Sequence, residues 1–259
     1  MSPEKGVQIV DGFPFRGDVR ILLRHESGLV VMDKPVGVRS HPNTAEEDPR
    51  ALLTCYYDSG SESYFLPGGR GPRANFFLIN RLDAPTSGII LGAFEEETAK
   101  IVRAQFAAHL VEKIYEAIVF GEGIGRQQVW RDVLRKDRRN GSLRVRKGGN
   151  QTAVCKVREL AMARTQFPLT RIELSPETGR SHQLRVQCAE RKIPIVGDKT
   201  YGDFRRNREI FRQIGTKRLF LHAQRISCEF NWNGRVVHID VVSDTPAEFD
   251  QLVRYEPKR

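Results

Sequence analysis

A short polar segment between two apolar runs carries the first residues that could do chemistry. Within "NFFLINRLDAPTSGIILGA" (75–93), Arg81 and Asp83 stand two positions apart, so in an extended segment their side chains leave on the same face. A carboxylate held rigidly between buried strands could serve as a nucleophile or a base if a nearby cation keeps it ionised. The alternative is a turn, in which Asp83 accepts backbone hydrogen bonds and Gly88 supplies a free dihedral angle. The local sequence leaves both interpretations open.

A second group of strong hydrogen-bond donors lies far downstream, in "SPETGRSHQLRV". We expect this stretch to open a helix that runs from about Gly179 to Arg191. Donors at a helix N-terminus suit a phosphate or a carboxylate. The arginines could instead be surface charges or salt-bridge partners, and the histidine a satisfied core residue. The group consists of Arg180, His182, Gln183 and Arg185.

The chain is strongly basic. Its 259 residues include 42 Lys and Arg against 32 Asp and Glu, which gives a formal net charge of +10. An excess of this size favours a polyanionic partner, either nucleic acid or an anionic membrane surface. Much of it lies in residues 126–147 and 203–218, where Arg outnumbers Lys and neighbouring aromatic residues offer stacking surfaces. One such run is more often a solvated face, but two runs of one sign favour contact with phosphates.

Several classes of protein are disfavoured by what the sequence lacks. No apolar stretch approaches the roughly 18 residues of a membrane span, and the N-terminus has no apolar signal-peptide core, so we expect a cytoplasmic protein. None of the four cysteines forms a C-x-x-C pair, and the six histidines follow no zinc-binding spacing, so a metal site is disfavoured. Neither a G-x-G-x-x-G nor a P-loop motif is present.

The pattern of apolar runs predicts an α+β fold with a mixed or antiparallel sheet. The clearest helix is 95–113, with an acidic first turn and an apolar stripe that includes Leu110. Asn-Gly within 138–145 indicates a hairpin, and the Gly- and Pro-rich segment 59–75 is typical of a surface loop. Strands are expected at 28–35, 75–79, 88–93, 113–121, 153–160, 170–176 and 226–232.

Five segments resemble the motifs of the RluA-type pseudouridine synthases, in the order in which that family has them. "NRLDAPTSG" resembles the H-R-L-D-x-x-T-S-G signature, and "VVMDKPVGVRSHP" resembles the D-K-P-x-G-x-x-x-H-P motif. "EKIYEAIVFG" resembles the K-x-Y-x-A-x-V-x-G strand. "LSPETGRSHQLRV" with "IPIVGDKTYG", and then "LFLHAQRISCEF", resemble the two remaining motifs. Five matches in family order are far more specific than any one of them.

The resemblance implies a pseudouridine synthase fold: a large mixed, mainly antiparallel sheet with flanking helices and a central active-site cleft. It implies isomerisation of uridine to pseudouridine in RNA, without a cofactor or metal. Asp83 then corresponds to the catalytic aspartate, Arg185 to the arginine that pairs with it, and Tyr115 to the tyrosine that stacks on the target base. Arg81 corresponds to the arginine that fills the space left by the flipped nucleotide. Further substrate contacts are expected from Asn80, Thr86, Arg180, His182 and Gln183.

The sequence departs from the family pattern at two positions. Asn80 stands where a histidine is usual before R-L-D, and Gln187 stands where a histidine is common after H-Q-L-R. Neither position is the aspartate or its arginine partner, so we expect activity to survive. The role of position 80 is the open question that this departure raises.

We expect residues 1–20 to form an N-terminal extension and residues 21–259 to form the catalytic domain, without the separate N-terminal RNA-binding domain of several relatives. RNA recognition then rests on the catalytic domain, which makes the two basic stretches candidates for RNA contact. "GDKTYGDFRRNR" resembles the branch of the family that modifies transfer RNA, with ribosomal RNA as the alternative substrate. We expect no obligate protein partner and a monomer.

Two alternative functions belong to other classes: RNA binding without catalysis, and glycoside hydrolysis. A catalytically inactive RNA-binding protein on the same fold is disfavoured because the Asp83, Tyr115 and Arg185 set is intact. A glycoside hydrolase would need a second carboxylate about 5–10 Å from the first, and the sequence nominates none.

Overall fold

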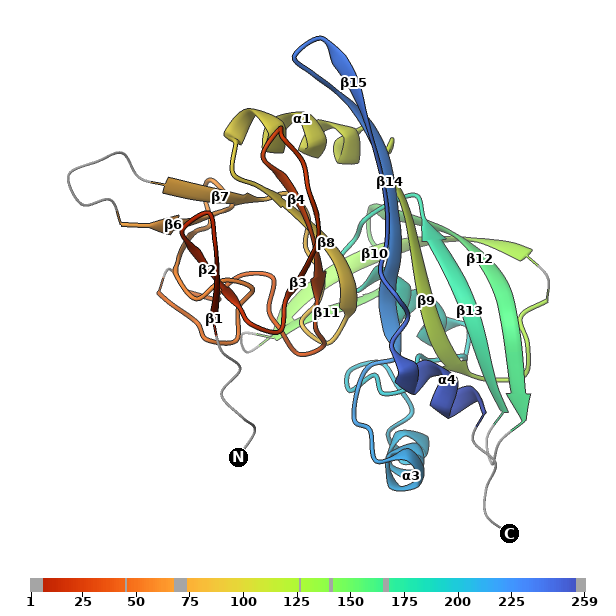
Figure 1. Ribbon diagram of the computed structural model, residues 1–259. Coiled ribbons are helices and arrows are strands. Elements are labelled where there is room, and N and C mark those ends of the chain that lie inside the picture. Colours follow the sequence, from red (N-terminus) through yellow and green to blue (C-terminus); the bar gives the residue numbers. More distant parts are fainter. Residues whose placement is uncertain are drawn as a thin grey trace. The chain divides into compact units, whose positions relative to one another are not determined.

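Strands make up most of the regular structure of this chain. The computed structural model contains fifteen strands and four helices among the residues it describes (Figure 1). The strand pairs whose register is defined are antiparallel, which confirms the predicted α+β class with a mainly antiparallel sheet. The described residues are 7–44, 46–67, 74–125, 127–139, 142–164 and 168–254.

The chain forms two units, each assembled from two separate stretches of sequence. Unit 1 combines Met1–Val111 with Arg225–Ser243, and unit 2 combines Glu112–Gln224 with Asp244–Arg259. Strand β14 (Leu221–Trp232) contributes its first residues to unit 2 and the rest to unit 1. Asp83 therefore belongs to unit 1, whereas the Arg185 region belongs to unit 2.

Unit 1 is organised around strand β8, which is buried along its whole length. β8 pairs with β4, with the end of β7 and with β14; β3 continues the sheet from β4, and β6 and β5 continue it from β7. Helix α1 packs against β7 and β8. The other elements of unit 1 are β1 (Val7–Val10), β2 (Phe13–Arg16), β3 (Arg20–Arg24), β4 (Leu29–Lys34), β5 (Tyr56–Asp58), β6 (Ser63–Leu66), β7 (Ala74–Leu78), β8 (Ser87–Ala93), α1 (Glu96–Ala107) and β15 (Arg235–Val242).

The buried strand β8 has a sequence suited to its position. "SGIILGA" shows no alternation of apolar and polar residues, as expected of a strand covered on both faces. Ile89 and Leu91 pack in one apolar cluster with Leu29 and Val31 of β4. At Gly92 the neighbouring strand comes so close that a Cβ atom would lie 2.3 Å from Cζ of Phe76. The small residue is therefore needed for strands β7 and β8 to pack.

Unit 2 is a twisted run of long strands in the order β11, β10, β12, β13, β9 and then β14 (Figure 1). Helix α2 packs against β10 and β11, and α4 packs against β13. The elements of unit 2, besides its share of β14, are β9 (Glu112–Phe120), β10 (Gln127–Arg139), β11 (Ser142–Lys147), β12 (Gln151–Arg164), β13 (Pro168–Pro176), α2 (Gln183–Glu190), α3 (Phe204–Ile214) and α4 (Ala247–Val253).

The core of unit 2 follows from the period-two pattern of β13. Ile172 and Leu174 are fully buried, and they pack with Phe120 of β9 and with Phe220 and Phe249. Because alternate side chains of a strand point to opposite faces, this pattern places one face of β13 against the core. The apolar cluster fixes the register in which β9 and β13 pair.

The structure confirms most of the strands that the sequence predicts. Strands β4, β7, β8, β9, β12, β13 and β14 cover the expected ranges. The predicted hairpin is also confirmed, because Arg139 pairs with Ser142 across the connection between β10 and β11. Its Asn-Gly pair, residues 140–141, lies outside the described residues.

Three local predictions were wrong. Segment 59–75 is not all loop: Ser63–Leu66 forms β6, because the Tyr64 side chain is fully buried and anchors the segment in the core. Helix α1 ends at Ala107, before Leu110, which is 64% exposed and so adds nothing to the apolar stripe. The helix expected from about Gly179 begins only at Gln183, because the preceding residue has a left-handed backbone. Within segment 59–75, residues 68–73 lie outside the described part.

Replacing Gly92 by alanine should destabilise the protein by about 1–3 kcal/mol, since the added methyl group overlaps the Phe76 ring. Urea unfolding of wild type and variant measures the difference. Gly179→Ala is the matched control, because a Cβ atom there meets no other atom within 4 Å. Equal unfolding midpoints for the two variants would contradict the close packing at Gly92.

Candidate active site

Asp83 lies in a turn between β7 and β8. The amide of Thr86 donates to the backbone carbonyl of Asp83 at 2.9 Å, and Gly88 adopts a φ of 109°. The turn interpretation of this segment is therefore correct, although the acceptor is the main-chain oxygen of Asp83. Thr86 is buried and Asp83 is half-buried. This turn bond involves only main-chain atoms of Asp83.

Asn80 ends the pairing between β7 and β8. The Ile79 amide donates to the Leu91 carbonyl at 2.9 Å, and the Leu91 amide donates to Oδ1 of Asn80 at 2.7 Å. In a regular antiparallel pair a main-chain carbonyl would accept this second bond. The Asn80 side chain thus replaces the main chain where the segment leaves the sheet toward Asp83. This contact gives Asn80 a role in positioning the turn; substrate contact by Asn80 stays a prediction.

Ser40 holds the residue before Asp83. Its hydroxyl donates to the Leu82 carbonyl at 2.7 Å and accepts from the Leu82 amide at 3.0 Å. Ser40 is itself buried, and its own carbonyl accepts a hydrogen bond from the Tyr64 hydroxyl at 2.7 Å. The Ser40 side chain, which is far from Leu82 in the sequence, therefore forms hydrogen bonds with both the amide and the carbonyl of Leu82.

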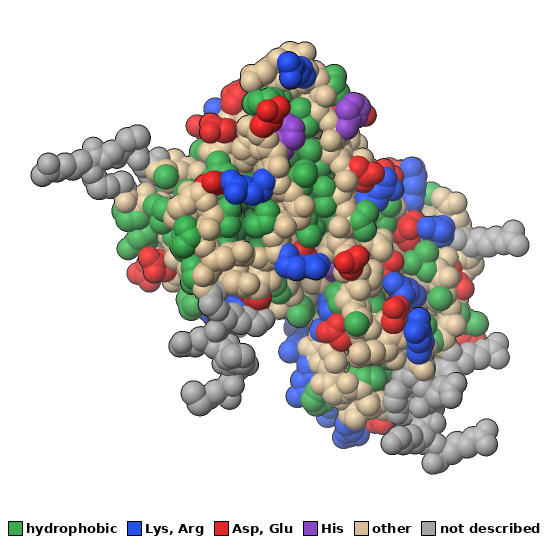
Figure 2. Space-filling model, viewed as in Figure 1, with side chains coloured by type: hydrophobic (Ala, Val, Ile, Leu, Met, Phe, Trp, Pro, Cys, Tyr) green, Lys and Arg blue, Asp and Glu red, His purple; other side chains and the backbone are tan. Residues whose placement is uncertain are grey.

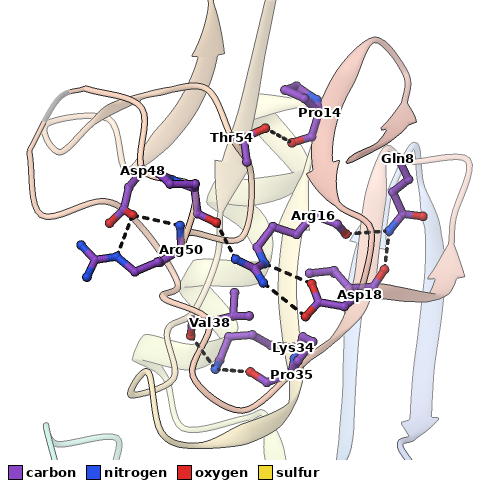
Figure 3. Close-up of polar contacts among 12 residues, drawn as sticks. Gln8, Pro14, Arg16, Asp18, Lys34, Pro35, Val38, Asp48, Arg50 and Thr54 are labelled. Atoms are coloured by element: carbon purple, nitrogen blue, oxygen red, sulfur yellow. Dashed lines mark hydrogen bonds and ion pairs between the residues drawn. The ribbon is translucent and has the colours of Figure 1, made fainter. Parts of the chain in front are cut away.

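Lys34 holds the residue after Asp83. Its side chain is fully buried, and Nζ donates to the carbonyls of Val38 at 2.8 Å, Pro35 at 3.1 Å and Ala84 at 3.3 Å. Figure 3 shows the first two of these bonds within a network of polar contacts. The Gly37 amide adds a bond to the Ala84 carbonyl at 2.8 Å. Asp83 therefore sits between two residues whose backbones are fixed by distant parts of unit 1. The sequence had suggested no role for Lys34 or Ser40, although both lie in a quoted motif.

Arg81 forms an ion pair with Glu62. Its Nη1 lies 2.7 Å from a carboxylate oxygen of Glu62, and its side chain is 58% exposed. An exposed pair of this kind contributes little to stability and is readily exchanged. Arg81 can therefore reach a partner outside the protein at small cost.

In unit 2, Arg185 is held by a buried carboxylate. Its Nε and Nη2 atoms lie 2.8 and 2.9 Å from the two oxygens of Asp198, and both side chains are buried. The amides of Thr200 and Tyr201 also donate to Asp198, at 2.8 and 3.0 Å. Burial raises the pKa of the Asp198 carboxyl, but the bonds and charge of Arg185 and these amides outweigh it, so the pKa lies below its ordinary value. The two-point contact fixes the plane of the guanidinium group.

Gln183 occupies the centre of the segment before α2. Its Oε1 accepts from the Thr178 hydroxyl at 2.8 Å and from the Arg180 amide at 3.0 Å. Its Nε2 donates to the Val154 carbonyl at 3.1 Å and to Oε1 of Gln187 at 3.2 Å. All four hydrogen-bonding positions of the amide are thus used inside the protein. These contacts give Gln183 a positioning role; substrate binding by it stays a prediction.

His182 and Arg180 lie closer to the surface. His182 has a φ of 52°, and its Nδ1 lies 2.8 Å from the Tyr201 hydroxyl. Arg180 is exposed, with Nε donating to the Thr152 carbonyl at 3.1 Å. Both remain candidates for substrate contact.

Tyr115 lies on β9 opposite Leu174 of β13, partly buried against the core of unit 2. Two positions earlier, and therefore on the same face of the strand, burial lowers the pKa of the Lys113 ammonium. The strand thus carries an aromatic ring and a partly desolvated amine side by side. The structure describes Asp83 in one unit and Tyr115 and Arg185 in the other, and the pairing of Asp83 with Arg185 stays a prediction.

All four cysteines are buried free thiols, and burial raises the pKa of Cys55 and of Cys155 to about 12. In the described part of the chain no three His, Cys, Asp or Glu side chains gather as metal ligands would. Nor does any described helix have the length and apolar character to cross a membrane.

Comparisons with known proteins agree with the motifs. A profile of the family described as RNA pseudouridylate synthase matches residues 28–190. A "tRNA pseudouridine synthase C" of Salmonella typhi is 30% identical over 234 residues, covering 86% of this chain and 85% of that protein. One from Pasteurella multocida (strain Pm70) is 36% identical over 216 residues, covering 79% and 84%. The solved structure "Human RNA Pseudouridylate Synthase Domain Containing 4" aligns with a TM-score of 0.62 at 23% identity over 90% of both chains. This likeness confirms the predicted fold.

Replacing Asp198 by asparagine should reduce stability at neutral pH by about 3–5 kcal/mol, because it breaks the buried ion pair between Asp198 and Arg185. Since the folded pKa of Asp198 is lowered, its stabilising effect is present above the ordinary aspartate pKa of 3.8 and is lost as pH falls toward the folded value. The stability gap between wild type and variant should therefore narrow below about pH 4. Urea unfolding at a series of pH values measures it, and a gap that persists unchanged at pH 3 would contradict this role.

Replacing Asn80 by alanine should lower the free energy of unfolding by about 1–3 kcal/mol, since the Leu91 amide loses its acceptor. Asn80→Asp keeps an acceptor oxygen and should retain most of the stability. Arg81→Ala serves as the neighbouring control, because it removes only an exposed ion pair. Denaturant unfolding compares the three variants, and equal losses for alanine and aspartate would rule out the hydrogen bond as the cause.

Proposed function

The chain belongs to the RNA pseudouridylate synthase family, and we propose that it converts a specific uridine of transfer RNA to pseudouridine in the cytoplasm. One observation carries the choice of transfer RNA: relatives matched over about 85% of their length are called tRNA pseudouridine synthase C. The motif "GDKTYGDFRRNR" supports the same choice. The net charge of +10 suits a polyanionic substrate.

The reaction moves the uracil base from its nitrogen-linked to a carbon-linked attachment on the same ribose, so no group is gained or lost. A base inside a helical stack cannot be reached, and the uridine must first be flipped out. We assign Tyr115 to stacking on the flipped base, because an aromatic ring supplies the flat apolar surface that a base requires. Arg81, which is exposed and only weakly engaged, is suited to enter the space that the base leaves.

Asp83 is assigned as the catalytic carboxylate. Breaking the glycosidic bond requires a nucleophile or a group that stabilises positive charge on the sugar, and an ionised aspartate can serve as either. The backbone is fixed on both sides of Asp83, because Ser40 binds the main chain of Leu82 and Lys34 binds that of Ala84. Such preorganisation is what a reacting group needs, because misplacement by about 1 Å can cost a hundredfold in rate.

Arg185 is assigned as the cation that keeps Asp83 ionised. An opposite charge within about 4–6 Å favours the carboxylate form once water is excluded. The bidentate pair with Asp198 engages Nε and Nη2 and fixes the plane of the guanidinium group. Asp198 thereby positions Arg185, and Arg185 acts on Asp83. Asn80 positions the turn that carries Asp83 by accepting a hydrogen bond from the Leu91 amide. Thr86, Arg180 and His182 are proposed to contact the RNA.

Asp83→Asn should abolish isomerisation while leaving RNA affinity nearly unchanged, since it removes the reacting charge but not the shape of the site. Release of tritium to water from transfer RNA labelled at uridine C5 measures the reaction. We expect the rate to fall by about a thousandfold or more. Asp240→Asn is the matched control, because Asp240 is an exposed carboxylate paired with Arg225 in the same unit. Wild-type release by Asp83→Asn would exclude the assignment; no release by the wild type from any RNA would favour an RNA-binding protein without catalysis.

A further inference from the structure

A cavity of about 530 Å³ lies beside helix α3 in unit 2. This volume falls within the roughly 300–1,000 Å³ typical of sites for small molecules. Its walls come from three segments, residues 196–199, 204–211 and 216–220. None of the residues to which a step of the isomerisation is assigned lines it. The cavity is therefore a second concave site, and its chemistry can be read from its walls.

The walls combine exposed and buried aromatic rings. Phe204, the first residue of α3, is 58% exposed, whereas Phe220 is buried at 1%. Phe211, about two turns further along the same face of α3, also lines the cavity. Single exposed apolar residues are ordinary, but an exposed ring at the edge of an aromatic cavity offers a flat surface for another flat group.

Cations surround the opening. Lys199, Arg208 and Lys217 line the cavity and are exposed, and Nζ of Lys217 lies 3.9 Å from the centre of the Phe211 ring. Among the described residues, no ion pair involves any of these three side chains. In the lower part of the view, where Figure 1 places α3, Figure 2 shows Lys and Arg side chains gathered on the surface.

The acidic groups near the cavity are already engaged. Asp203 caps α3 by accepting from the amides of Arg205 and Arg206. Glu209 pairs with Arg212 at 3.1 Å, and Glu248 lies 3.6 Å from Arg218. The positive charge at the opening is therefore not neutralised by its neighbours, and it favours an anionic ligand.

The cavity is preformed by hydrogen bonds within unit 2. Oδ1 of Asn207 accepts from the Gly197 amide at 2.7 Å, and its Nδ2 donates to the Asp198 carbonyl at 3.1 Å. At Gly197 the loop passes so close to the Arg218 carbonyl that a Cβ atom would lie 1.7 Å from it. The loop that Asn207 ties to α3 thus carries Asp198, the partner of Arg185. A ligand in the cavity rests on the same loop that positions Arg185.

We propose that this cavity binds one unstacked nucleotide of the RNA substrate, away from the uridine that reacts, with its base against Phe204 and its phosphate at Lys217 and Arg208. An aromatic platform with adjacent cations is the combination by which proteins hold unpaired nucleotides. The inference rests on the proposed function, since it takes RNA as the ligand. It adds a site that can select RNA whose shape presents a second exposed base.

The test measures binding of unfractionated transfer RNA by the full chain across a series of KCl concentrations, with Asp83→Asn in every protein to prevent turnover. Phe204→Ala should weaken binding by between about fivefold and a hundredfold, the effect of losing one stacked base, without changing the salt dependence. Phe204→Tyr keeps a ring and should bind as the parent does. Lys217→Ala should reduce the slope of log affinity against log salt by about 0.7–0.9, the effect of one lost phosphate contact.

Arg212→Ala is the matched charge control, because Arg212 lies on α3 only five residues before Lys217, is 72% exposed and is outside the cavity. It should change affinity and slope little. Unchanged binding by Phe204→Ala would overturn the proposal, and so would an Arg212→Ala effect equal to that of Lys217→Ala, which would show a diffuse basic face. Tritium release by the chain with Asp83 intact separates the two claims. Release without any Phe204 effect refutes only the cavity, whereas a Phe204 effect without release refutes only the isomerase.

Discussion

The buried ammonium of Lys34 determines how the segment around Asp83 is arranged. A cation removed from water is tolerated only where polar atoms replace its hydration. The partners of Lys34 include three carbonyl oxygens, among them that of Ala84. Because Ala84 follows Asp83 directly, satisfying the lysine also fixes the chain beside the carboxylate. Ser40 has the same effect on Leu82. Hydrogen bonds to the main chain of Leu82 and of Ala84 thus fix the backbone on both sides of Asp83.

The same logic applies to Arg185 in unit 2. A buried ion pair contributes little net stability compared with an apolar pair, but it fixes the orientation of both partners. The bond pattern of Asp198, with two contacts to Arg185 and two to main-chain amides, holds the guanidinium in one plane. Asn207 then ties this loop to α3, so a basic helix is mechanically connected to an arginine of the proposed reaction. In both places the buried polar groups fix the orientation of particular residues.

Local patterns predicted the strands well and the connections poorly. The apolar runs of β4, β8 and β13 are strong because the strands are buried. The Gly and Pro content of segment 59–75 favours a loop, and only the burial of Tyr64 shows that part of the segment is a strand. The many charged residues of 203–218 likewise obscure the apolar face of α3, on which Ile210 is buried and Phe211 lines the cavity.

By itself the sequence determined the class of fold and the order of the motifs, because residue types and short spacings are local properties. The resemblance of those motifs to a known family then made Asp83, Tyr115 and Arg185 candidates. Only the tertiary structure decided what holds them. It placed Arg185 beside Asp198, and it made Asn80 the acceptor of the Leu91 amide. It also brought Ser40 to Leu82, 42 positions away. These partners depend on sheet register and on which segments of the chain come together. No pattern within one segment encodes a hydrogen bond to a residue that only folding brings near.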